Sequence, residues 1–199
     1  NLKKIDMELT QTASTDKIRL SASDWQQAAL DALSEGGLQN IAIEMIAKRL
    51  GVTKGSFYWH FDSRDALIQA ALELWESQEQ EQVFGRLDAL PDAQARLKAL
   101  VSLVASELKA HKIYSELLKA IDHPLVKPVL ERVSKRRIDY LTASFRMAGL
   151  PRKQALNRAL LTYASYVGFL QLNLQLGYPK LSHSEFEQYV GHLTETLIP

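Results

Sequence analysis

Cysteine is absent from the 199-residue chain, and long apolar runs and a strong net charge are missing as well. The absence of cysteine excludes disulfides, thiolate metal sites and a cysteine nucleophile, and we expect a protein of the reducing cytoplasm. No apolar run approaches the roughly 18 residues of a membrane span, so we expect neither a membrane partner nor a signal peptide. The net charge of +1 gives no general attraction to nucleic acid, so any such argument must be local.

The histidine pattern gives no support for an enzyme. The five histidines are His60, His111, His123, His183 and His192. None belongs to a His-Glu-x-x-His or Glu-x-x-His motif, and the chain has no glycine-rich phosphate loop. We therefore expect no catalytic residue, no metal site and no cofactor. Helical enzymes without such motifs exist, so an all-helical enzyme stays open as an alternative function.

The residues that are present predict helices along the chain, and the fold class is all-α. An apolar content of 46% allows a substantial core, and apolar residues recur at helical spacing while no strand pattern competes. Capping residues, glycines and prolines mark the expected helix ends: Ser21 or Ser23, Gly36-Gly37, Asp62-Ser63, a start between Pro124 and Pro128, and Ser182 with Glu185.

Residues 46–61 predict two short helices joined at a glycine. The first helix has one apolar stripe, formed by Ile43, Ile46, Ala47 and Leu50. Gly51 ends this helix, and Thr53 can accept a backbone N–H as the N-cap of the next one. In the second helix Phe57 and Phe61 are four residues apart and therefore turn inward together.

The outward positions of the second helix carry a cation, a hydroxyl, an imidazole and two polar-tipped aromatic rings. These residues are Lys54, Ser56, Tyr58, Trp59 and His60. Such groups suit phosphates and base edges. The segment is therefore interpreted as a DNA-reading element, and double-stranded DNA is the expected partner.

This segment resembles the helix-turn-helix of the TetR/AcrR family of transcriptional regulators over about residues 20 to 75. The matching positions are Ile46, Ala47, Gly51, Val52, Thr53, Gly55, Phe57, Tyr58, His60, Phe61 and Leu67. The chain has Ala42 where the family usually has a Ser or Thr cap. It has Arg64 where Lys is usual, which keeps the charge and adds a fork of donors.

The resemblance implies roles on DNA for eight residues. The residues expected to contact phosphates are Thr53, Lys54, Tyr58, His60 and Arg64. Gly55 would let the backbone approach a DNA strand closely, and Ser56 and Trp59 would face base edges. One such helix reads only a few base pairs, so we expect a palindromic operator bound by a dimer, with half-sites about 34 to 36 Å apart. Repression, as opposed to activation, is expected only from the resemblance to this family.

The resemblance also implies an N-terminal three-helix helix-turn-helix domain followed by a helical ligand-binding and dimerisation domain. We expect a mobile arm at residues 1–19, the DNA-binding domain at 20–66 and the second domain at 67–199. A small-molecule inducer, largely apolar, would bind in the second domain. Its expected lining residues are Trp75, His111, Tyr114, Tyr140, Phe145, Tyr163 and Tyr166.

Dimerisation is predicted from residues 152–176, which are apolar on two sides of one helix. The first stripe contains Leu156, Leu160, Tyr163, Val167, Leu170 and Leu174. The second stripe and the last helix supply the expected dimer interface: Leu161, Ala164, Ser165, Gly168, Leu172, Tyr189, Leu193 and Leu197. A helix buried on two faces needs two neighbours. The alternative is that both stripes are covered inside one monomer.

Two further alternatives remain at this point. The charge run Lys135-Arg136-Arg137 is interpreted as a solvated helix face, with a second DNA contact as the alternative. The whole chain could also be a helical adaptor whose helix-turn-helix packs only against protein.

Overall fold

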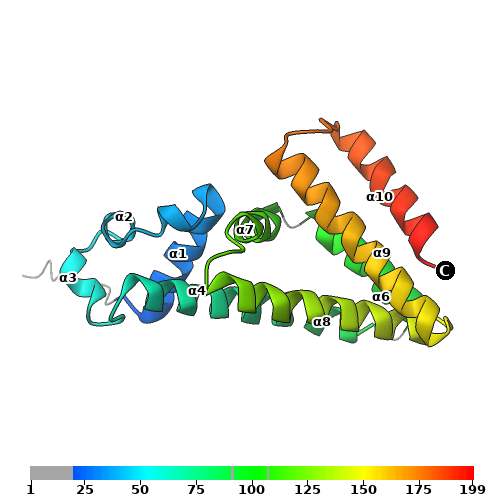
Figure 1. Cartoon of the computed structure of the whole chain (residues 1–199), viewed down its shortest axis with the longest axis horizontal. Coiled ribbons are helices and arrows are strands. Elements are labelled where there is room, and N and C mark those ends of the chain that lie inside the picture. Colours follow the sequence, from blue (N-terminus) through cyan, green and yellow to red (C-terminus); the bar gives the residue numbers. More distant parts are fainter. Residues whose placement is uncertain (1–19, 91, 107) are drawn as a thin grey trace, which may run out of the picture.

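The computed structural model describes residues 20–90, 92–106 and 108–199, and these residues form helices and connecting turns without a strand (Figure 1). The expected all-α class is confirmed. The expected mobile arm at residues 1–19 lies outside the described part of the chain. Within that part, no helix is long and apolar enough to cross a membrane.

The elements follow one another with short connections. The first group is α1 Ala22–Gly36, the 3-10 turn η1 Leu38–Asn40, α2 Ile43–Arg49, α3 Lys54–Phe57 and α4 Arg64–Glu79. The second group is the π-helical turn η2 Gln80–Phe84, α5 Gly85–Asp88, α6 Ala93–Ser106, α7 Leu108–Lys119, α8 Val126–Met147, α9 Arg152–Leu170, the π-helical turn η3 Gln171–Gln175 and α10 His183–Leu197.

Local capping explains where several helices begin. Ser21, and not Ser23, caps α1, and it forms a capping box with Asp24. Ser182 and Glu185 form the expected box at the start of α10. Helix α8 begins at Val126, between the two prolines, because proline is tolerated only in a first helical turn.

The helix-turn-helix departs from the expected caps at one point. Thr53 occupies the N-cap of α3, but its side chain makes no capping hydrogen bond. Instead the Ser56 hydroxyl donates to the Thr53 carbonyl at 2.7 Å. The helix is also short, since it ends at Phe57 and a turn follows. The Phe61 N–H still bonds the Phe57 carbonyl at 3.0 Å, so the two rings keep their helical spacing.

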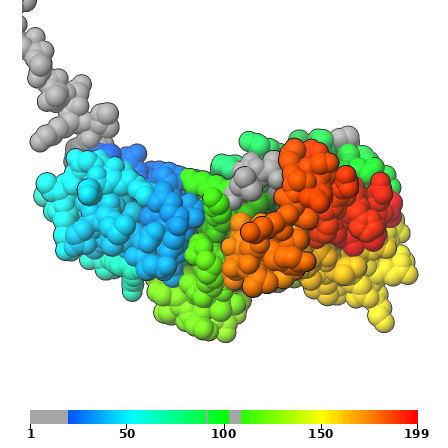
Figure 2. All heavy atoms as spheres, turned by 90° about the horizontal axis from the view of Figure 1, so that it is seen from above, coloured from blue at the N-terminus to red at the C-terminus, as the bar shows by residue number. Residues whose placement is uncertain are grey.

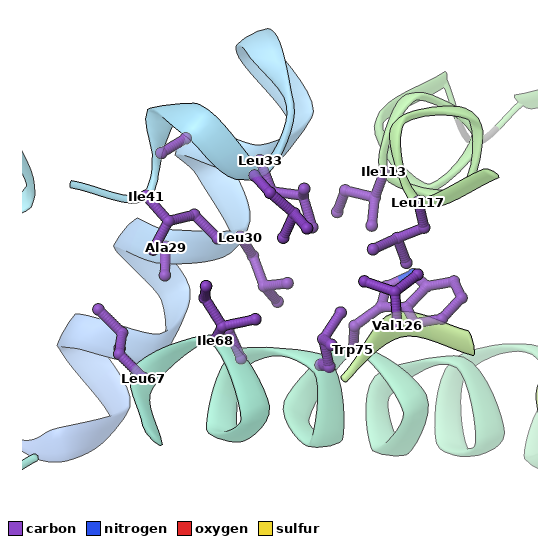
Figure 3. Packing of buried hydrophobic residues seen from close by; sticks show 14 of the residues in the cluster. Ala29, Leu30, Leu33, Ile41, Leu67, Ile68, Trp75, Ile113, Leu117 and Val126 are labelled. Atoms are coloured by element: carbon purple, nitrogen blue, oxygen red, sulfur yellow. The ribbon is translucent and has the colours of Figure 1, made fainter. Parts of the chain in front are cut away.

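The main core lies between α1, α4, α7 and the start of α8. Figure 3 shows Leu30 and Leu33 of α1 facing Ile68 and Trp75 of α4, with Leu117 of α7 closing the cluster. Each large side chain buried here stabilises the fold by roughly 1.5–3 kcal/mol. The expected domain boundary lies between residues 66 and 67, inside α4. One core cluster contains residues from both sides of this boundary, because α4 packs against helices of both expected domains.

The molecule is elongated, with the helix-turn-helix at one end and α9 and α10 toward the other (Figure 1). Helices α4 and α8 lie beside each other along its length. Figure 2 shows the same separation from above, with the helix-turn-helix (cyan and blue) distant from the C-terminal helices (orange and red). Helix α4 thus connects the two ends.

Candidate DNA-binding surface and ligand cavity

The turn between α2 and α3 is built on a glycine. Gly51 has a φ of 69°, which lies in the left-handed region that side chains with a Cβ avoid. The Leu50 N–H bonds the Ile46 carbonyl at 2.9 Å, and the Val52 N–H bonds the Ala47 carbonyl at 3.0 Å. These bonds close α2 and turn the chain toward α3.

Phe57 fixes α3 on the body of the molecule. Its ring is fully buried and meets Trp25 of α1 edge-on, with 5.4 Å between ring centroids. Phe61 also stacks on Phe57, with 5.7 Å between ring centroids. Because Phe57 and Phe61 point inward, the residues between them lie at or near the surface.

The outward residues of this segment are exposed to different degrees. Trp59 is 87% exposed and Tyr58 is 55% exposed, which is unusual for such large apolar surfaces. The other exposed positions are Thr53, Lys54 and Gly55, while Ser56 and His60 are half-buried. The structure therefore brings seven of the eight expected DNA-contact residues onto one short segment.

Two carboxylates lie close to the cations of this surface. Lys54 forms an ion pair with Glu44 of α2, and this hydrogen bond raises the pKa of Lys54 while it lowers the pKa of Glu44. Arg49 forms an ion pair with Glu35 of α1. A phosphate that approaches Lys54 must therefore compete with the Glu44 carboxylate.

Arg64, which is expected to clamp a phosphate, uses two of its donors inside the protein. Its Nε donates to the Ile41 carbonyl and its Nη2 to the Leu38 carbonyl, both at 2.6 Å. The side chain is half-buried. Arg64 therefore braces the first residue of α4 against the segment that precedes α2, and these two donors are occupied inside the protein.

The second feature is a cavity of about 670 Å³ beyond the main core. It is lined by residues from α1, α4, α6, α7, α8, α9 and α10, together with the π-helical turns η2 and η3. Its walls are mainly apolar, and Phe169, Phe186 and Tyr189 form one aromatic side. Such a volume and lining are typical of a small-molecule site.

Four of the expected ligand residues line this cavity, and three do not. Trp75, His111, Tyr163 and Tyr166 lie on the wall. Tyr114 is buried behind it, where its hydroxyl bonds the Tyr163 hydroxyl. Tyr140 instead packs on Phe84 of η2, and Phe145 is buried in a separate cluster between α6, α8 and α9.

Three tyrosine rings lie beside a guanidinium at the wall of the cavity. The Arg137 guanidinium carbon lies 4.4 Å from the ring centroid of Tyr114, 5.6 Å from that of Tyr166 and 5.9 Å from that of Tyr163. Arg137 also donates from Nε to a Glu79 oxygen at 2.5 Å. Burial lowers the pKa of Arg137, but the Glu79 carboxylate outweighs this and keeps the pKa above its ordinary value. Burial raises the pKa of Tyr166 to about 12, so this hydroxyl stays protonated near neutral pH.

The charge run on α8 does not form a solvated face. Lys135 is exposed, but Arg136 pairs with Glu76 of α4 at 2.6 Å, and Arg137 pairs with Glu79 of the same helix. Arg132 joins Glu76 from one turn earlier at 2.8 Å. Glu76 and Glu79 were missed at the sequence level because their partners lie more than 50 residues away. The matching helical spacing on α4 and α8 was the only available signal.

The expected dimer residues fall into two groups. Leu161, Ala164, Gly168 and Leu172 are exposed along α9 and η3, and Ser165 is half-exposed beside them. Tyr189, Leu193 and Leu197 of α10 instead line the cavity, and Leu197 is only 5% exposed. The α10 part of the expected interface stays a prediction, because Tyr189 and Leu193 are only half-buried, whereas Leu197 is covered within the chain.

The first stripe of α9 is also different from the expectation. Tyr163, Val167, Leu170 and Leu174 pack against the core, but Leu156 and Leu160 are exposed. Ala155 and Ala159 face the interior in their place and are fully buried. Small residues let α9 approach α8 closely. Because α9 turns its alanines toward the interior, Leu156 and Leu160 remain on the outer side.

An all-helical molecule with an exposed helix-turn-helix defines the class of helix-turn-helix DNA-binding proteins, and comparison with known proteins narrows this class. The tetR family of bacterial regulatory proteins matches residues 27–71 of the chain. The HTH-type transcriptional regulator BetI of Klebsiella pneumoniae (strain 342) is 28% identical over 180 residues, which are 86% of this chain and 91% of that protein. BetI of Escherichia coli O45:K1 is 30% identical over 136 residues, which are 64% of this chain and 69% of that protein.

Solved structures agree with the fold. A TetR-family regulator from Agrobacterium tumefaciens has a TM-score of 0.75 at 16% identity, covering 89% of this chain and 97% of that one. A transcriptional regulator from Saccharomonospora viridis, solved in complex with choline, has a TM-score of 0.77 at 18% identity, covering 87% of this chain and 95% of that one. The chain belongs to the TetR family, and it is a DNA-binding transcriptional regulator.

Proposed function

We propose that this regulator is a repressor that binds a palindromic operator as a homodimer and leaves it when a small molecule fills the cavity. Residues 20–66 contact the operator. Residues 67–199 form the dimer and bind the ligand, and α1 adds to the wall of the cavity. The observation that carries the proposal is the exposed segment from Thr53 to His60, held outward by the buried ring of Phe57.

On DNA, Thr53, Lys54, Tyr58 and His60 contact phosphates, while Ser56 and Trp59 face base edges. Gly55 supports this arrangement. A Cβ at Gly55 would meet only the Thr53 hydroxyl oxygen, at 3.7 Å, among the described residues. Packing within the chain therefore leaves room for a side chain there, and close approach of a DNA strand explains the glycine.

The proposed dimer forms through the exposed face of α9 and η3. Leu156, Leu160, Leu161 and Leu172 are each between 43% and 55% exposed there. A Cβ at Gly168 would meet nothing within 4 Å, so a second helix can approach closely at this point. An apolar face of this kind is typical of a protein interface.

The proposed ligand is a small molecule with a largely apolar body. The apolar lining of the cavity supports this choice, and the choline complex of the S. viridis regulator shows that a related fold holds a small organic ligand. A ligand acts only if it binds two conformations unequally. The ligand therefore prefers a conformation in which the two recognition segments no longer match the half-site spacing.

Salt dependence of DNA binding tests the proposed phosphate contact. We expect Lys54→Ala to weaken binding to all duplexes and to lower the salt slope of the affinity by about one. Lys153→Ala, at an exposed position of α9, is the matched control and should leave the slope unchanged. Glu44→Gln should strengthen binding, because it removes the carboxylate that competes with phosphate for Lys54.

Two results would contradict these roles. If Lys54→Ala changed the preferred bases and kept the salt slope, Lys54 would contact base edges instead of phosphate. If the unmodified protein bound no duplex even at low salt, the helical adaptor would be the better explanation.

A further inference from the structure

Arg137 occupies a place that suits a ligand cation. Tyr114 of α7 and Tyr163 and Tyr166 of α9 turn ring faces toward its guanidinium, at 4.4 to 5.9 Å from their centroids. Aromatic ring faces beside a positive charge also bind quaternary ammonium groups in proteins. We call these three residues the tyrosine cluster.

The ion pair of Arg137 with Glu79 leaves polar atoms unused. The Glu79 Oε2 and the Arg137 Nη1 are buried and have no hydrogen-bond partner in the described part of the chain. The Glu79 side chain is only 9% exposed, and both residues line the cavity. A buried carboxylate with one free oxygen can accept a second cation or donor, since such atoms are costly to leave unpaired.

We propose that Arg137 is an internal cation that fills the ligand subsite of the empty regulator, and that the effector is an organic cation that replaces it. The head group of the effector takes the tyrosine cluster and uses Glu79 as its counter-ion. Its apolar part extends along the mainly apolar walls of the cavity. This inference rests on the proposed ligand-controlled function and names the class of its ligand.

An anionic effector fits the same wall less well. A carboxylate ligand on Arg137 would lie beside the Glu79 carboxylate, which is 2.5 Å from the Arg137 Nε, and like charges at this spacing repel. The ring faces of the tyrosine cluster also carry negative charge density, which repels an anion and attracts a cation.

Displacement of Arg137 also has a route to the DNA-binding end. Arg137 on α8 contacts Glu79 in the last turn of α4, and Arg64 in the first turn of α4 bonds the carbonyls of Leu38 and Ile41. When the effector takes Glu79, α8 loses this contact with the C-terminal end of α4. Because Arg64 keeps the other end attached, a shift of α4 moves the helix-turn-helix with it.

Calorimetric titration with choline tests the inference, and neutral 3,3-dimethyl-1-butanol serves as its isostere. If the guanidinium fills the subsite in about nine-tenths of molecules, Arg137→Gln raises the affinity for choline about tenfold. Glu79→Gln lowers that affinity by about tenfold or more, because the counter-ion is lost. The control is Arg132→Gln, which removes an α8 arginine outside the cavity. It should leave the affinity for choline unchanged.

A measurement on the unsubstituted protein covers the case in which these variants do not fold. The Arg137 Nε–Hε resonance, held over the tyrosine rings, should move toward the position of a solvated arginine when choline is added. An unchanged resonance at saturating choline would overturn the inference. Loss or weakening of choline binding in a folded Arg137→Gln variant would also overturn it. The same holds if the neutral isostere binds as strongly as choline.

Operator binding without ligand is measured beside these titrations. If the wild-type protein without ligand binds no operator DNA, the proposed function is contradicted. The choline titrations do not depend on DNA binding, so they test the ligand class separately. The two failures are therefore distinguishable.

Discussion

Phe57 and Trp59 lie two residues apart and have opposite environments. Phe57 is fully buried against Trp25, and Trp59 is 87% exposed. We expect Phe57→Ala to cost about 3–5 kcal/mol of unfolding free energy, because it opens a cavity in the core. We expect Trp59→Ala to change stability by less than about 0.5 kcal/mol but to weaken operator binding. Urea unfolding and DNA titration of both variants measure this contrast, and a strongly destabilised Trp59→Ala would contradict it.

Arg64 gives a second test at the residue scale. Lysine in its place keeps the charge but cannot hold both carbonyls with one fork. Arg64→Lys should therefore lower the unfolding free energy by about 1.5–3 kcal/mol, the range for hydrogen bonds to charged groups, and leave the salt slope of DNA binding unchanged. Thermal unfolding and salt titration measure the two quantities. If the melting temperature were unaltered and the salt slope of DNA binding fell by about one, Arg64 would act through a phosphate contact instead.

Residues whose partners are close in sequence were predictable, and residues with distant partners were not. Phe57 and Phe61 followed from their four-residue spacing. The brace by Arg64 spans 23 and 26 residues, and the pairing of Arg137 with Glu79 spans 58. A helical pattern tells which residues share a face, but it does not tell which distant helix that face meets.

At the scale of elements, the ion pairs between α4 and α8 make one contact sensitive to pH. The hydrogen bond from Arg132 lowers the pKa of Glu76, burial opposes this shift, and the bond from Arg136 adds to it. A lowered pKa means that the ionised form stabilises the folded state above the ordinary value of 4.5. This stabilisation is lost as the pH falls through the folded-state pKa.

We therefore expect Glu76→Gln to cost about 1–2 kcal/mol near neutral pH, since each partner is a charged donor and the seam is partly exposed. The difference from wild type should shrink as the pH falls below 4.5. Chemical unfolding between pH 3 and pH 7 measures it. Glu131→Gln, at an exposed position of α8, is the control. A difference that persists in acid would show that the Glu76 charge is not the cause.

Helix ends were easier to predict than helix faces. Ser182 with Glu185 and the prolines around Val126 act on their own backbone, so their signals are local. The orientation of α9 depends instead on how closely it packs against α8. The buried Ala155 and Ala159 allow that close contact and turn Leu156 and Leu160 outward.

At the scale of the whole molecule, the exposed face of α9 is the basis of the proposed dimer. Leu161 is 55% exposed in the middle of this face, and a charge there would be buried unpaired on association. Leu161→Glu should give a folded monomer with weakened operator binding, as measured by light scattering at micromolar concentration. Ile121→Glu, at a site 44% exposed after α7, should remain dimeric. A wild-type protein that is itself monomeric would remove the basis of the proposed dimer.

The most direct test of the central claim is selection from a random double-stranded DNA pool with the purified protein at moderate salt and without ligand. We expect enrichment of one palindrome, with half-site centres about one helical turn apart. We also expect that choline, added at the end, releases this DNA from the wild-type protein. Enrichment of no sequence, from protein that is folded and dimeric, would contradict a sequence-specific regulator that reads an operator through the segment from Thr53 to His60.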